Sequence, residues 1–74
     1  MNINNKEKIL ERVQELTDAE LDHLIQLSEI DIANYKVIIA SYNEEKKQQY
    51  GLPFLSRLEA FDSGLMAELE RRTG

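Results

Sequence analysis

Apolar residues recur along most of this chain at steps of three and four, the spacing that places side chains on one face of an α-helix. Three such sets are separated by polar or helix-breaking residues. They consist of Ile9, Leu10, Val13 and Leu16, then Leu21, Leu24, Ile25, Leu27, Ile32, Tyr35, Ile38, Ile39 and Tyr42, and finally Phe54, Leu55, Leu58, Phe61, Leu65, Met66 and Leu69. The pattern predicts an all-α fold, a small bundle of three helices over residues 5–16, 18–50 and 53–72. The first helix is short, the central one long and the last of medium length.

The middle of the second segment, residues 35–42, is rich in β-branched and aromatic residues, which also suit a strand. We expect a helix there because no glycine or proline occurs before Gly51 and because the chain has no second β-rich run to pair with. Thr17 and Glu20 have the spacing of a capping box, which predicts that the long helix begins directly after the threonine. Gly51, with a proline two residues later, predicts the end of this helix and a turn.

The second helix carries a second apolar stripe, on a different side of the helix from its main apolar face. The stripe consists of Ile30, Ala33, Val37 and Ala40, which recur at alternating steps of three and four, as in a coiled coil. A surface helix needs only one apolar face, so a helix with two is contacted from two directions. A chain of 74 residues is also near the lower limit for a self-sufficient core. We therefore expect a homodimer that completes the bundle, with this stripe at its interface.

Two polar residues, Ser28 and Asp31, fall within the main apolar face of the second helix and are candidates for buried polar groups. Asp31 can be interpreted as a rim residue beside the core, as a buried group that fixes helix register, or as a catalytic carboxylate. Its candidate partners are Tyr35, Lys6, Arg12 and Arg57.

Gly64 interrupts the third apolar set, and a glycine inside a helix costs on the order of 1 kcal/mol relative to alanine. Two explanations are open: the helix kinks at Ser63 and Gly64, or the glycine lets another backbone come close. Asp62 also lies on the apolar face of this segment, and it can cap a new helical turn if the helix breaks.

Composition narrows the kinds of site that the chain can hold. The 74 residues form one domain, 1–74, with no cysteine and a single histidine, so we expect no cofactor and no metal. That histidine, His23, follows Glu20 in the Glu-x-x-His pattern of di-iron bundles. It projects off the main apolar face, however, and we expect it at the surface.

The charge argues against a nucleic-acid partner. Asp and Glu number 14 against 9 Lys and Arg, which gives a net charge of −5. A phosphate backbone repels such a chain, and the basic pairs Lys46-Lys47 and Arg71-Arg72 fall near predicted helix ends, where cations favour the helix dipole. No apolar run approaches the roughly 20 residues of a membrane span, and the polar N-terminal stretch lacks the apolar core of a signal peptide. We expect a cytoplasmic protein that binds neither nucleic acid nor membrane directly.

The sequence holds no nucleophile paired with a base and no glycine-rich phosphate loop, so we expect no enzyme. The pattern favours a small non-enzymatic protein–protein interaction module that self-associates and acts as an adaptor or regulator on an unidentified protein partner. The alternative is an acidic inhibitor or decoy, for example from a phage or a mobile element, that mimics nucleic acid and blocks a nucleic-acid-binding enzyme. The carboxylates are interleaved with lysines rather than arrayed in a dense stripe, which favours the first interpretation.

Overall fold

The computed structural model describes residues 3–74 of the chain, with side chains from residue 6 onward. Its elements follow one another as α1 (Ile3–Glu11), a 3₁₀ turn η1 (Val13–Glu15), α2 (Asp18–Ala40), α3 (Glu44–Lys46), a π-helical turn η2 (Lys47–Gly51) and α4 (Leu52–Thr73). About 90% of the described residues are helical, and none of them lies in a strand. The predicted all-α fold is confirmed, and the β-branched run before Ala40 is helical.

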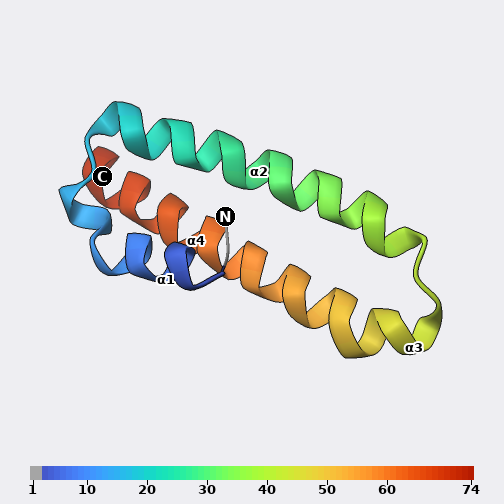
Figure 1. Cartoon of the computed structure of the whole chain (residues 1–74). Coiled ribbons are helices and arrows are strands. Elements are labelled where there is room, and N and C mark those ends of the chain that lie inside the picture. The colour runs from blue at the N-terminus through green and yellow to red at the C-terminus, as the bar shows by residue number, and fades with distance from the viewer. Residues whose placement is uncertain (1–2) are drawn as a thin grey trace.

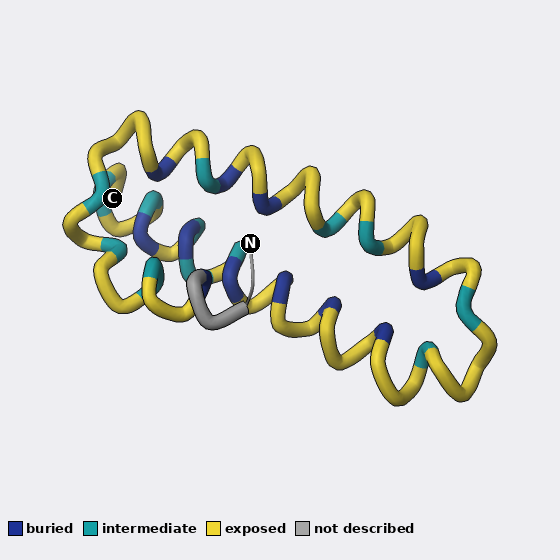
Figure 2. The backbone as a smooth tube through the Cα atoms, in the orientation of Figure 1, coloured by how far each residue is buried: buried dark blue, intermediate teal, exposed yellow. Residues whose placement is uncertain are grey.

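The two long helices, α2 and α4, form an antiparallel hairpin, and α1 lies along only one half of it (Figure 1). The molecule measures 41 × 20 × 19 Å. Buried residues face inward between the helices, whereas the outer faces of the hairpin are exposed (Figure 2). The central apolar cluster lies at the end of the hairpin that α1 covers, and it consists of Leu21, Ile25, Phe61 and Leu65.

Helix α1 packs mainly on α4. This packing is possible because Gly64 has no side chain, which leaves room on α4 for the Leu10 side chain of α1. A Cβ atom on this glycine would come within 2.7 Å of the Cδ2 atom of Leu10. Helix α4 runs through Gly64 without a break, and the space beside this glycine holds the Leu10 side chain rather than the backbone that one of the two explanations expected.

Helix α2 begins at the predicted capping box. The Thr17 hydroxyl accepts a hydrogen bond from the Glu20 amide at 3.1 Å, and the Glu20 carboxylate accepts one from the Thr17 amide at 2.9 Å. The bonds from the backbone and the hydroxyl of Thr17 lower the pKa of the Glu20 carboxyl. Because both hydrogen bonds of the capping box are present, α1 and α2 are separate helices and not one bent rod.

Replacing Thr17 with alanine is expected to lower the free energy of unfolding by about 1 kcal/mol, because an amide at the helix N-terminus loses its acceptor. Urea denaturation at fixed protein concentration measures this change. Ser56→Ala is the matched control, since Ser56 is an exposed hydroxyl inside α4. Equal stabilities of the two variants would contradict the capping role.

Helix α2 ends at Ala40, so the predicted boundary near residue 50 is wrong. Two short polar side chains make the turn. The Ser41 hydroxyl donates to the Ile38 carbonyl at 2.7 Å, and the Asn43 side chain caps the next helix by accepting from the Lys46 amide at 2.8 Å. Side chains that bond the nearby backbone compete with helix continuation and favour caps. The chain therefore reverses earlier than expected, and a long return helix pairs with α2 along its whole length.

The predicted turn at Gly51 and Pro53 is also wrong, because both residues lie inside the return helix. The backbone between α3 and α4 keeps right-handed helical dihedrals throughout. Pro53 has no amide hydrogen, and its ring crowds the carbonyl four residues earlier, so the helix widens before it into a π turn closed by the Leu52 amide on the Lys47 carbonyl. A Cβ atom on the buried Gly51 would lie 3.1 Å from a methyl of Ile39, so this glycine lets the two helices approach.

Candidate interaction surfaces

The four residues expected at an interface all lie exposed on α2. Ile30 is 54% exposed and Val37 is 74% exposed, and the alanines between and beyond them, Ala33 and Ala40, are exposed as well. At 100° per residue, this stripe lies opposite the buried residues of α2. We call these four residues the α2 seam. The fold brings them together on one side of the helix and leaves them open to a partner.

Large exposed apolar side chains are confined to one part of the described chain. They are Leu27, Ile30, Val37, Ile38, Tyr50, Leu52 and Phe54. Most of them lie on the half of the hairpin that α1 leaves uncovered (Figures 1 and 2). An exposed apolar region of this kind on a small domain usually marks a contact surface.

The groove between α2 and α4 continues beyond α1 as an open recess of about 250 Å³. We call it the open groove. It is lined by Lys6, Asp31, Asn34, Tyr35, Ile38, Phe54 and Leu58. The rings of Tyr35 and Phe54 pack with their centroids 4.8 Å apart, which joins the two walls. Burial raises the pKa of Tyr35, and the neighbouring Tyr42 acts in the same direction.

The two polar residues of the apolar face of α2 have different surroundings. Ser28 lies inside the hairpin and is 3% exposed. The side chain of Asp31 is 53% exposed, which agrees with the interpretation of this residue as a rim residue beside the core and not with a buried group. Its carboxylate lies 3.6 Å from the ammonium of Lys6, which is itself buried and sits 4.6 Å from the centre of the Phe61 ring. The ion pair of Lys6 and Asp31 therefore lies at the rim of the core, with the lysine side chain buried and the aspartate side chain exposed to solvent.

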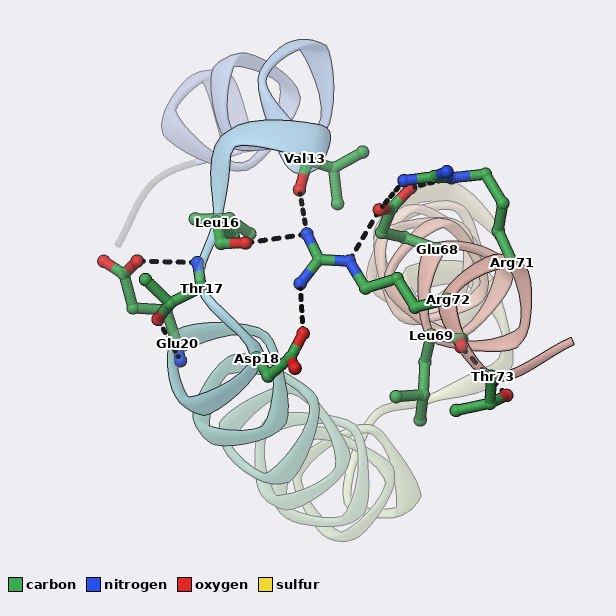
Figure 3. A network of polar contacts seen from close by, with 10 residues as sticks. All are labelled: Val13, Leu16, Thr17, Asp18, Glu20, Glu68, Leu69, Arg71, Arg72 and Thr73. Atoms are coloured by element: carbon green, nitrogen blue, oxygen red, sulfur yellow. Dashed lines mark hydrogen bonds and ion pairs between the residues drawn. The ribbon is translucent and has the colours of Figure 1, made fainter.

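Arg72 joins the end of α4 to the connection between α1 and α2 (Figure 3). Its side chain is 17% exposed and donates to the Leu16 carbonyl at 2.7 Å, the Val13 carbonyl at 3.2 Å and the Asp18 carboxylate at 2.9 Å. The Leu16 carbonyl thereby gains a donor at the end of η1, and the Val13 carbonyl gains a second donor besides the Leu16 amide. The sequence predicts Arg71 and Arg72 only as cations near a helix end, and a local pattern does not reveal a contact between residues 54 to 59 positions apart.

Glu68 completes this network one turn before Arg72. The residue is 5% exposed, and it accepts hydrogen bonds from Arg71 at 2.9 Å and from Arg72 at 2.7 Å. Bonds from Arg71 and Arg72 lower the pKa of Glu68 to about 2, although its burial acts in the opposite direction. We call the set of Val13, Leu16, Asp18, Glu68 and Arg72 the Arg72 clasp and interpret it as structural, because it fixes the three helices at one end of the molecule.

His23 is exposed on α2. Within residues 3–74, no three His, Cys, Asp or Glu side chains come together in an arrangement that could hold a metal ion. No helix in the described part of the chain combines the length and the apolar character needed to cross a membrane.

Comparison with known protein families, with curated protein sequences and with solved structures found no match to this chain.

Proposed function

We propose that this protein is a small non-enzymatic interaction module that self-associates through α2 and acts on another protein as an adaptor or regulator. The observation that carries the proposal is the α2 seam. Its two large residues, Ile30 and Val37, are 54% and 74% exposed on the side of α2 opposite the core. Two large apolar side chains aligned with two alanines on a helix favour contact with a second helix.

The composition of the seam suits an antiparallel pair of α2 helices. A two-fold axis beside α2, level with the midpoint between Ala33 and Val37, sets Ile30 against Ala40 of the second copy. The same axis sets Ala33 against Val37 of the second copy. Every large side chain then meets an alanine, so the helices approach closely without a clash. Such an interface uses the same patch on both chains and adds the buried area that a chain of 74 residues lacks alone.

An acidic decoy of a nucleic-acid-binding enzyme is the alternative. A mimic of a phosphate backbone needs rows of negative charge that are not interrupted. On one flank of the α2 seam, the exposed carboxylates Asp22 and Glu29 are followed by Lys36, which ends the row of negative charge. We therefore favour the interaction module. We also propose a cytoplasmic location. Disulfides are rare in the cytoplasm, and this chain has no cysteine with which to form one.

The melting midpoint of the wild-type protein is expected to rise with protein concentration, because self-association stabilises the folded chain by mass action. Val37→Glu is expected to remove this dependence, since it places a charge at the centre of the seam. Ser56→Glu adds the same charge to the exposed face of α4 and should keep the dependence. A wild-type midpoint that stays constant over about a hundredfold range of concentration would contradict self-association.

A further inference from the structure

Asn34 lies at the centre of the exposed apolar surface of α2. The large exposed apolar side chains of this helix are Leu27, Ile30, Val37 and Ile38. Two of them precede Asn34, by seven and four residues, and two follow it, by three and four residues. At these spacings side chains are neighbours on one side of a helix. Asn34, which is itself exposed, therefore has apolar side chains before and after it along the surface that a second helix would cover.

A polar side chain at this position is unfavourable in a helix–helix interface unless it is paired. A second helix that covers the surface takes the Asn34 amide out of water, and an amide buried without a partner costs free energy. Within residues 6–74, no hydrogen bond joins the Asn34 side chain to another group that could replace the water. An asparagine amide both donates and accepts, so an amide of a second chain can satisfy it.

The antiparallel arrangement of the α2 seam brings the Asn34 residues of two copies together. A two-fold axis level with the midpoint between Ala33 and Val37 lies one residue beyond Asn34, so the two asparagines are offset by only about 3 Å along the helices. Asn34 lies on the flank of the seam toward Ile38, about 80° round the helix from the middle of the seam. A two-fold axis perpendicular to the plane of the two helices places this flank of both copies on the same side of the interface. The two amides can therefore meet.

Other registers separate the two asparagines. Steps of three and four repeat after seven residues, so one α2 helix can slide by seven residues along the other and still set apolar stripes against each other. This slide moves the two Asn34 residues to about 7.5 Å or about 13.5 Å apart along the helices, depending on its direction. Both amides then lie in an apolar interface without a partner. A buried asparagine in a coiled coil fixes the register and the number of chains in this way.

We propose that Asn34 determines the specificity of self-association, because its side-chain amide forms a hydrogen bond with the amide of Asn34 of a second copy across the two-fold axis. This inference rests on the proposed function, since the second copy is the partner that the α2 seam takes. The apolar side chains around Asn34 provide the attraction. The pair of asparagines selects the antiparallel register and limits the assembly to two chains.

The first experiment compares the dimer dissociation constants of the wild type, Asn34→Asp and Gln48→Glu by sedimentation equilibrium. Asn34→Asp sets two carboxylates against each other across the axis and removes both donors, so we expect the dissociation constant to rise about tenfold or more. Gln48→Glu makes the same exchange of an amide for a carboxylate at an exposed position of η2 and should dimerise like the wild type. Asn34 is exposed in the single chain, so the substitution leaves the helical content unchanged.

The second experiment uses the absence of cysteine from the chain, which lets a single introduced cysteine report on the register. Ala40→Cys should form few disulfide-linked dimers on mild oxidation, because the proposed register separates the two copies of residue 40 by about 15 Å along the helices. Adding Asn34→Leu to Ala40→Cys should make linked dimers abundant. Without the asparagine pair, one of the shifted registers and the parallel orientation become accessible, and both bring the two cysteines together.

Two results obtained with a dimeric wild type would overturn the role of Asn34 alone. One is equal dissociation constants for Asn34→Asp and Gln48→Glu, and the other is equal linking of Ala40→Cys with and without Asn34→Leu. A wild type that is monomeric at every concentration would overturn this inference together with the proposed self-association.

Discussion

Replacing Arg72 with methionine is expected to lower the melting midpoint by roughly 10 °C, well beyond the effect of losing the Thr17 cap. Methionine keeps the apolar stem of the side chain but removes every donor of the guanidinium. The Leu16 carbonyl then loses its donor, the Val13 carbonyl keeps only the Leu16 amide, and the buried Glu68 carboxylate loses one of its two cations. Thermal unfolding followed by circular dichroism at fixed protein concentration measures the change.

The matched control for this substitution is Arg71→Met. Arg71 is 59% exposed, and among the residues that the structure describes its side chain bonds only to Glu68, so its loss leaves the connection between α1 and α2 tied to α4. We expect a much smaller fall in the midpoint. Midpoints of the two variants within about 2 °C of each other would contradict the role of the Arg72 clasp.

The second large effect is expected in acid. Hydrogen bonds from Arg71 and Arg72 hold the pKa of Glu68 at about 2, below the ordinary value of 4.5. Because the folded protein has the lower pKa, the ionised carboxylate stabilises the fold fully above pH 4.5, and this contribution is lost as the pH falls from 4.5 toward about 2. Glu68→Gln is therefore expected to lower the midpoint at pH 7 and to differ little from the wild type near pH 2.

Melting curves of the wild type, Glu68→Gln and Glu59→Gln between pH 7 and pH 2 test this dependence. Glu59 is an exposed carboxylate of α4 and serves as the control. The difference between the wild type and Glu68→Gln should shrink within the acid range, whereas the control should follow the wild type throughout. A difference that keeps its size from neutral to acid pH would contradict the pairing of Glu68 in the folded state.

The helices themselves could be predicted because their signals are local. Apolar residues at steps of three and four mark all three apolar faces, and the side chains of Thr17 and Glu20 form the capping box that their spacing predicts. The exposure of Ile30 and Val37 also follows from the pattern, since a helix cannot turn two opposite stripes toward one core.

The reversal of the chain could not be placed because two signals competed. Gly51 followed by Pro53 is a strong stop signal, yet here a π turn accommodates the proline inside a continuous helix. The true signal was Asn43 followed by Glu44 and Glu45, a cap with acidic residues in the first helical turn. Which of the two wins depends on where the apolar faces of α2 and α4 meet, and that is a property of tertiary packing.

The Arg72 clasp and the open groove could not be predicted from the sequence for a related reason. Both depend on which half of the hairpin α1 covers, and that half is set by Leu10 fitting onto Gly64. Gly64 stands out in the sequence, but its partner Leu10 lies on another helix, so the local pattern around Gly64 does not identify that partner. The position of Asp31 stayed open between rim and core for the same reason, because the approach of Lys6 to the rim cannot be inferred from α2 alone.

Sedimentation equilibrium of the wild-type protein and of Val37→Glu tests the central claim, self-association through the α2 seam, most directly. With a chain mass of 8.6 kDa, the account predicts that the wild type approaches twice this mass as concentration rises. It predicts that Val37→Glu stays at the single-chain mass while its circular dichroism spectrum keeps its helical content. A wild type that sediments as a single chain at every concentration, or a Val37→Glu variant that dimerises as well as the wild type, would contradict it.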